Sequence, residues 1–306
     1  MEIYLPIAQM SVNWVVILAM GMGVGLLSGL LGVSGGFITT PLLIFYGIPS
    51  AVAVSTQASP ITAASLVGTL KQGSRNSVDY RMGLFLMVGG TVGSAVGVYV
   101  FGLLQKIGQI DLVIQVSYFL LLGSVGGLML RESVQALLAV RRGERLPSTH
   151  LRRHTWIHNL PFKVRFRRSG LYISVIPVIV LGLMVGVLTA ILGTGGAFLL
   201  IPAKIYLLRM RTTLAMGTSQ FQMLIVAIVS TLLHAVTDQT VDIVLAFLLV
   251  VGGVLGAQIG LRIGSRLRAE ELRALLAALL VLIAARLLFD LVVTPSDLYS
   301  VATMVR

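Results

Sequence analysis

The sequence predicts an all-α polytopic membrane protein with two inverted-topology repeats of five hydrophobic segments each, interrupted by Gly-rich helix breaks. Three observations support this fold class: the composition, the spacing of the apolar segments and an internal repeat. Of the 306 residues, 57% are hydrophobic and 11% are charged, and the mean hydropathy is +0.97. A water-soluble domain with an ordinary charged surface does not have this composition. We therefore expect one multi-pass domain in the lipid bilayer.

The composition also argues against several kinds of chemistry. The chain contains no cysteine, which excludes disulfides, thiolate metal sites and thiol nucleophiles. The net charge of +12 would suggest a nucleic-acid partner for a soluble protein, but in a membrane protein basic residues first mark cytoplasmic loops. We expect no nucleic-acid partner. The first residues lack a basic region before the apolar stretch, so the first hydrophobic helix is predicted to be retained.

The apolar segments form two sets of five, separated by a basic stretch. That stretch, 131–170, carries ten basic and two acidic residues and is predicted to be a cytoplasmic loop. The chain thus divides into a first membrane repeat (1–130), the basic loop (131–170) and a second membrane repeat (171–306). The apolar segments are 12–31, 37–47, 51–70, 82–103, 110–130, 171–192, 197–208, 213–236, 241–261 and 271–293.

The basic residues predict the topology of these segments. If each segment returns the chain across the membrane, the ten basic residues of the loop and nine at other segment ends lie on one side, nineteen of 23 in all. Both termini then lie outside, and the two halves enter the membrane from opposite sides. The regions 12–47 and 171–208 each fit either two full crossings or a re-entrant hairpin, since both place the flanking charges alike.

Three blocks of the first half recur in the second half in the same order. Residues 78–100 align without a gap on 241–263 with eight identities, and GVSGGFITTP at 32–41 recurs as GTGGAFLLIP at 193–202. In addition, VSTQ resembles GTSQ about 163 residues later. The sequence therefore predicts an internal duplication. Glycines spaced by four within these segments predict faces where helices pack closely.

The two glycine clusters that interrupt apolar stretches predict an anion site. A helix break is tolerated at membrane depth only where the freed backbone faces protein or a wet cavity. The N-terminal end of the following short helix offers N–H groups and a positive dipole end, although a plain tight turn is the alternative. Nearby hydroxyl and amide groups bind an oxyanion without holding it as tightly as buried arginines. The candidate substrate-binding residues are Ser34, Gly35, Gly36, Thr56, Gln57, Thr194, Gly195, Gly196, Thr218, Ser219 and Gln220.

Few ionisable residues lie near membrane depth. Asp79 and Asp242 stand at equivalent positions before their helices, which favours helix capping and leaves proton coupling as the alternative. His234 is a third candidate for coupling because histidine titrates near neutral pH. Lys204 is expected to extend to the cytoplasmic edge of the membrane. No metal site and no cofactor are predicted.

These motifs together resemble those of a known family. The paired segments GVSGGFITTP and GTGGAFLLIP, the VSTQ and GTSQ blocks, HNLPFKVRF and TDQTVDIVLAFLLVVGGVLGAQIG look like the TauE/SafE sulfite exporter family of bacterial membrane permeases. The resemblance extends from about residue 15 to 293. It implies a secondary transporter that exports sulfite, or a related small sulfur-containing or organosulfonate anion, across the bacterial cytoplasmic (inner) membrane. The expected mechanism is alternating access, in which one repeat moves against the other.

Other functions stay open at this point. The alternatives to export are an uptake permease for an organosulfonate or another small anion, or a passive anion channel, because direction and coupling cannot be read from these residues. An enzyme is not expected, since the chain lacks cysteine, helix-spaced pairs of histidine and acidic metal ligands, and a clear serine–base pair. The preferred anion and the formation of a homo-oligomer are also left open.

Overall fold

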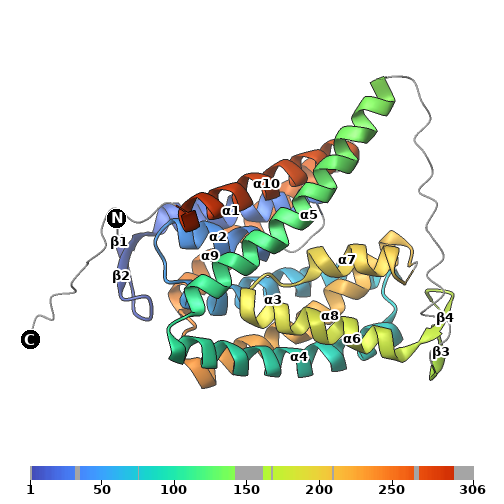
Figure 1. Cartoon of the computed structure of the whole chain (residues 1–306), viewed down its shortest axis with the longest axis horizontal. Helices are drawn as coiled ribbons and strands as arrows, with labels where there is room; N and C mark the ends of the chain where they lie inside the picture. Colours follow the sequence, from blue (N-terminus) through green and yellow to red (C-terminus); the bar gives the residue numbers. More distant parts are fainter. Residues whose placement is uncertain are drawn as a thin grey trace, which may run out of the picture.

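The computed structural model describes the chain except residues 1, 32–34, 75, 142–160, 167, 209, 265–268 and 293–306. The described residues form an α-helical bundle with two small β-hairpins (Figure 1). The helices are α1 (Trp14–Leu31), α2 (Gly36–Phe45), α3 (Ser50–Ser74), α4 (Tyr80–Ile107), α5 (Ile110–Arg141), α6 (Val175–Leu192), α7 (Ala197–Tyr206), α8 (Thr212–Leu233), η2 (His234–Asp238), α9 (Ile243–Gly264) and α10 (Ala269–Val292).

The helices follow the predicted apolar segments closely. Among the described residues, six helical stretches are long and apolar enough to cross a membrane, and they lie in α4, α5, α6, α8 with η2, α9 and α10. The predicted all-α, multi-pass membrane class is therefore confirmed. The structure places one helix on each of the ten predicted segments.

Helices α2 and α7 are too short to cross a bilayer. Each has ten residues, and at about 1.5 Å per residue it spans about half of a hydrocarbon core roughly 30 Å thick. Each contacts the helix before it, and α7 turns back along α6 (Figure 1). This length favours re-entrant hairpins over two full crossings in 12–47 and 171–208.

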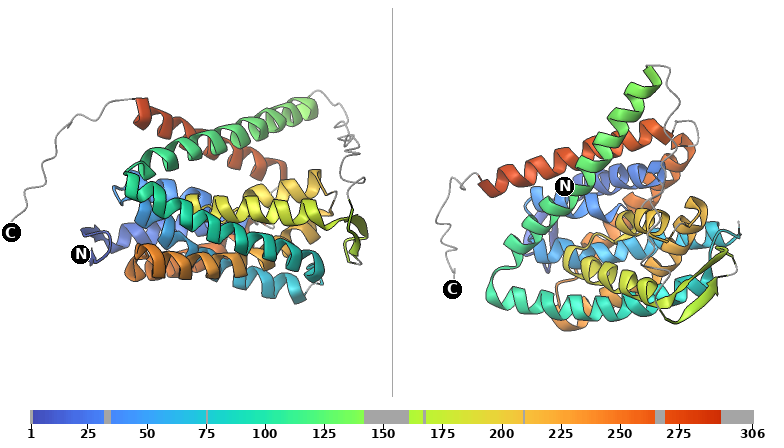
Figure 2. Two further views of the ribbon diagram at one scale, coloured as in Figure 1. Left: turned by 60° about the horizontal axis from the view of Figure 1, so that its bottom comes forward. Right: turned by 45° about the vertical axis from the view of Figure 1, so that its right-hand side comes forward.

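Two β-hairpins precede α1 and α6, and they were not predicted. Strands β1 (Glu2–Leu5) and β2 (Met10–Asn13) pair in antiparallel fashion, as do β3 (Lys163–Phe166) and β4 (Leu171–Ser174). The predicted basic loop 131–170 thus contains the end of α5 and strand β3, and α6 begins four residues after the start of the predicted segment 171–192. The hairpins lie at opposite ends of the molecule (Figures 1 and 2).

Backbone contacts through glycine join α1 to α9 and α4 to α6. A Cβ atom on Gly25 would lie 2.8 Å from the Cα atom of Gly253, and one on Gly256 would collide with the carbonyl oxygen of Met22. Likewise, a Cβ atom on Gly93 would collide with the carbonyl oxygen of Leu183. The predicted glycine packing faces are confirmed, and these helices approach closely because no side chain separates them.

Two glycines of α1 provide a matched test of this packing. We expect Gly25→Ala to destabilise the protein by about 1–3 kcal/mol, because its methyl group must push α9 away. Gly23→Ala is expected to leave stability unchanged or raise it by up to about 1 kcal/mol, because no atom of the described residues outside its own helix turn lies within 4 Å of its Cβ position. Thermal unfolding of both variants in detergent measures the difference, and equal melting temperatures would contradict the assignment.

The bounds of the elements recur along the chain. Helix α6 has the length of α1 and begins 161 residues later, at Val175 instead of Trp14, and α7 repeats α2 at the same offset. Helix α9 begins 163 residues after α4, at Ile243 instead of Tyr80. The contacts recur as well, since α1 packs on α9 as α6 packs on α4. Helices α3 and α8 pack on each other in the bundle, and α5 and α10 cross along one side (Figure 1).

Candidate functional site

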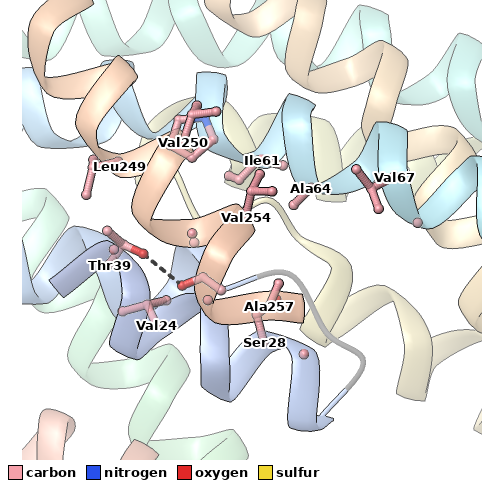
Figure 3. Close-up of a pocket in the computed structure, with 18 of the residues that line it drawn as sticks. Val24, Ser28, Thr39, Ile61, Ala64, Val67, Leu249, Val250, Val254 and Ala257 are labelled. Atoms are coloured by element: carbon pink, nitrogen blue, oxygen red, sulfur yellow. Dashed lines mark hydrogen bonds between the residues drawn. The ribbon is translucent and has the colours of Figure 1, made fainter. Parts of the chain in front are cut away.

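A cavity of about 270 Å³ lies between α1, α3 and α9, with the start of α2 and part of α8 completing its wall (Figure 3). Its polar inner part is formed by Gly35 and Gly36 at the N-terminal end of α2, together with Thr39 and Gln57. From there it extends to the exposed Lys71 in the last turn of α3. The cavity therefore connects a buried helix N-terminus, a favourable place for an anion, with the end of the molecule.

The two glycine breaks lie against each other beside this cavity. A Cβ atom on Gly36 would lie 2.9 Å from the carbonyl oxygens of Gly193 and Thr194. The second break differs from the first, because Gly195 and Gly196 have positive φ angles and the buried Thr194 hydroxyl accepts the N–H of Gly196 at 3.3 Å. Of the predicted residues at the breaks, Gly35 and Gly36 line the cavity, whereas those of the second break do not.

One residue of the first break, Ser34, lies outside the described residues. Its place at this break is therefore known from the sequence alone.

Gln57 and Gln220 bring amide groups to the cavity from α3 and α8. The side chain of Gln57 is 3% exposed, and the Oε1 atoms of both glutamines are buried without a hydrogen-bond partner in the described part of the chain. The side chain of Gln220 reaches α3, where it lies 2.9 Å from the Cβ position of Gly68. A glutamine amide presents donors or an acceptor by rotation, so both side chains are available to a ligand.

The three predicted hydroxyl residues of α3 and α8 contact other protein groups. The Thr56 hydroxyl accepts the N–H of Asp242 at 3.0 Å, and the Thr218 hydroxyl accepts the N–H of Asp79 at 3.0 Å. The third residue is Ser219. The side chains of all three are fully buried, and none lines the cavity. The sequence match of VSTQ with GTSQ pairs Thr56 with Ser219, but the contacts pair Thr56 with Thr218. Gln57 therefore corresponds in space to Ser219.

Ser219 accepts a hydrogen bond from a buried lysine. Lys204 Nζ donates to Ser219 Oγ at 3.0 Å, and the lysine is 0% exposed. The expectation that Lys204 extends to the edge of the membrane was wrong, because its side chain is directed toward α8. Among the described residues it forms no salt bridge with a carboxylate.

Asp79 and Asp242 connect each β-hairpin to the other half of the chain. Asp79 Oδ2 accepts the N–H of Ser169 at 3.0 Å and the hydroxyl of Ser169 at 2.6 Å, while its Oδ1 accepts the N–H of Met82. Asp242 Oδ2 accepts the N–H of Ile7 at 3.1 Å, and its Oδ1 accepts two N–H groups at the start of α9. Both carboxylates therefore cap a helix and hold a hairpin turn.

His234 is buried at the junction of α8 and η2, away from the cavity lining. Its Nδ1 atom lies 2.8 Å from Asp238 Oδ2, and its Nε2 atom lies 3.0 Å from the carbonyl oxygen of Ala190. The ring also packs edge-on against Phe101. The imidazole thus joins α8 and η2 to the end of α6.

Lys71 provides positive charge at the outer part of the cavity. We expect Lys71→Gln to raise the anion concentration for half-maximal flux a few-fold at low salt, with a smaller effect at high salt, because an exposed ammonium group acts by screened attraction. Lys106→Gln is the control, since Lys106 is exposed in the last turn of α4 and does not line the cavity. The same change in both variants would contradict a local role for Lys71.

A bundle of apolar helices that encloses a cavity with polar groups in its inner part, beside broken helices, is the architecture of a membrane transporter. Residues 17–287 match the family described as "Sulfite exporter TauE/SafE", and the chain belongs to this family. The resemblance noted in the sequence is thereby confirmed.

Curated relatives carry the names of transporters. The chain is 27% identical over 242 residues to a "Probable membrane transporter protein" of Xylella fastidiosa (strain 9a5c), covering 78% of this chain and 80% of the relative. It is 23% identical over 287 residues to the "Probable membrane transporter protein YunE" of Bacillus subtilis (strain 168), covering 91% and 98%. No solved structure matches. These findings support a membrane transporter and are consistent with a protein that is not an enzyme.

Proposed function

We propose that the protein is a secondary transporter that exports sulfite, or a related small sulfur-containing or organosulfonate anion, across the bacterial cytoplasmic membrane by alternating access. The observation that carries this proposal is the cavity in which the N-terminal end of α2 meets the amide groups of Gln57 and Gln220, whose Oε1 atoms are buried without a hydrogen-bond partner among the described residues. Helix N–H groups and amides stabilise an oxyanion, and neutral donors release it more readily than buried arginines do.

The size of the cavity supports a small substrate. A volume of about 270 Å³ admits a sulfite ion with several waters, since one water takes about 30 Å³ in the liquid. The lining also includes apolar side chains, such as Val24 and Ile61, which suit the short carbon chain of an organosulfonate.

The proposed mechanism rests on two inverted-topology repeats, 1–130 and 171–306. The equal lengths of α1 and α6 and of α2 and α7 support this, as do the hairpins at opposite ends of the molecule. Each hairpin turn binds the aspartate that precedes α4 or α9 of the other half. Such reciprocal contacts are expected when two similar units pack about a pseudo-two-fold axis.

The basic end of the molecule indicates the side of the membrane that the cavity faces. Arg81 donates to the carbonyl oxygen of Arg165, and Arg168 donates to that of Val78, so these arginines gather where α3 ends and β3 lies. The positive-inside rule makes this the cytoplasmic end and leaves both termini outside. The cavity extends to Lys71 at this same end, so in the proposed export cycle the anion binds here from the cytoplasm.

Flux measurements in proteoliposomes test the proposed function. We expect saturable sulfite flux that sulfate and a small organosulfonate suppress unequally, measured at several imposed pH gradients. Uphill flux driven by a proton gradient would establish coupling and contradict a passive channel. No flux of any of the three anions, from protein with a normal melting temperature, would remove the sulfur-anion assignment.

A further inference from the structure

A closed cluster of apolar side chains lies between α4, α6, α7 and α8. These helices are the counterparts of α9, α1, α2 and α3, which surround the open cavity, so the cluster and the cavity lie at equivalent places. Four apolar side chains form the cluster, and none is more than 1% exposed. They are Val185, Leu200, Met223 and Val226.

Each of these four side chains has a counterpart that lines the cavity. Residues of α6 and α7 follow their counterparts in α1 and α2 by 161 positions. Residues of α8 follow their counterparts in α3 by 162 positions, because Thr56 and Thr218 make equivalent contacts. The counterparts, in the same order, are Val24, Thr39, Ile61 and Ala64. One set of equivalent positions therefore forms a packed cluster, whereas the other set lines a cavity, in which Ala64 is exposed and the other three side chains are 2–5% exposed.

Two polar side chains are trapped beside the closed cluster. Gln222 and Ser94 are 0% exposed, and neither amide atom of Gln222 nor the hydroxyl of Ser94 has a hydrogen-bond partner in the described part of the chain. Their counterparts, Pro60 and Ala257, line the cavity. A buried polar group without a partner costs about 1–3 kcal/mol, so these groups are expected to bind a ligand in another state.

Resting on the proposed function, we propose that this closed cluster is the second half of the transport path. It opens to the opposite face of the membrane when the first cavity closes, and Gln222 and Ser94 then donate hydrogen bonds to the anion. The two halves exchange roles, and the anion passes from the amide of Gln57 to that of Gln222. The buried polar groups are thus satisfied in the state in which the substrate leaves.

Engineered disulfides test the exchange directly, because the natural chain has no cysteine. A Cβ atom on Gly90 would lie 2.5 Å from Val226 Cγ2, so Gly90→Cys with Val226→Cys places two Cβ atoms near the roughly 4 Å that a disulfide needs. The matched pair is Ala64→Cys with Gly253→Cys. These residues line the open cavity, and among the described residues the Gly253 Cβ position has one contact within 4 Å, the carbonyl oxygen of Gly21 at 3.9 Å.

We expect each pair, introduced alone, to cross-link on oxidation in proteoliposomes. In a variant that carries all four substitutions, a single molecule should form one cross-link or the other, but never both. Either cross-link should lower flux at least about tenfold and reduction should restore it, with a gel after the assay to show that sulfite left the disulfide intact. Both cross-links in one molecule, or normal flux through a cross-linked pair, would overturn the proposal. Exclusive cross-links without any anion flux would uphold the exchange and contradict only the proposed substrate.

Gln222→Leu tests the ligand role independently of the cross-links. We expect sulfite flux to fall at least about tenfold, the effect of one lost hydrogen bond of about 1.4 kcal/mol. The melting temperature should stay equal or rise, because the variant removes two unpartnered polar atoms. Normal flux would contradict the proposed role, as would a loss of flux that accompanies a lower melting temperature.

Discussion

Asp79→Ala and Asp242→Ala are each expected to lower the free energy of unfolding by about 3 kcal/mol or more. Each buried carboxylate accepts three hydrogen bonds, and bonds to a charged acceptor contribute about 1.5–3 kcal/mol each. Removing Asp79 leaves the N–H of Ser169 and the start of α4 without their acceptor. Thermal unfolding in detergent measures the loss, and the hairpin turn should become accessible to protease.

Asp290→Ala is the control for this pair of variants. Asp290 forms an ion pair with Arg286 at 3.2 Å on the partly exposed face of α10, and such pairs contribute at most about 1 kcal/mol. The sequence left proton coupling open for both buried aspartates. If Asp79→Asn and Asp242→Asn kept normal stability but abolished the pH dependence of flux, coupling rather than capping would be their role.

Gln57→Glu is expected to reduce anion flux about a thousandfold at neutral pH. A carboxylate at this position faces the bound anion in a buried cavity, where two like charges about 4 Å apart repel by about 4 kcal/mol at an effective dielectric of 20. Flux should recover as the pH falls and the introduced carboxyl group becomes neutral. Initial rates of sulfite uptake into inside-out vesicles, from pH 5 to 8, measure the effect.

Two variants separate charge repulsion from damage to the fold. Gln105→Glu adds the same charge at an exposed position of α4 outside the cavity, and its flux should be normal. Gln57→Met removes the amide without adding charge, so a smaller, pH-independent loss of flux is expected. A pH-independent loss in Gln57→Glu equal to that in Gln57→Met would contradict the repulsion.

Much of the fold was predictable because membrane helices carry strong local signals. Apolar runs indicated where each helix lies, and glycines spaced by four marked the contacts of α1 with α9 and of α4 with α6. The β-hairpins were missed because each strand has four residues, a run too short for a clear alternating pattern. A signal for β3–β4 was present in Gly170, whose positive φ angle serves the turn between the strands.

The site was harder to predict because burial and partners depend on tertiary structure. The sequence predicted that the two glycine-rich breaks lie together, and the structure places them against each other. The sequence did not indicate that the first break lines the cavity whereas the second does not. It treated Thr56 and Gln57 alike, although one binds a backbone N–H and the other faces the cavity. It also missed Gln222 and Ser94, because an isolated glutamine or serine has no distinctive pattern until the structure shows it buried without a partner.

The most direct test of the central claim asks whether the anion passes through this cavity. Ala64→Cys places a single thiol on the exposed wall formed by α3, and a maleimide attached there forms a thioether that sulfite does not cleave (Figure 3). Val96→Cys, on the exposed face of α4 and outside the cavity lining, is the matched control. We predict that labelling Ala64→Cys stops sulfite flux while labelling Val96→Cys does not. Equal flux before and after complete labelling of Ala64→Cys would contradict the account.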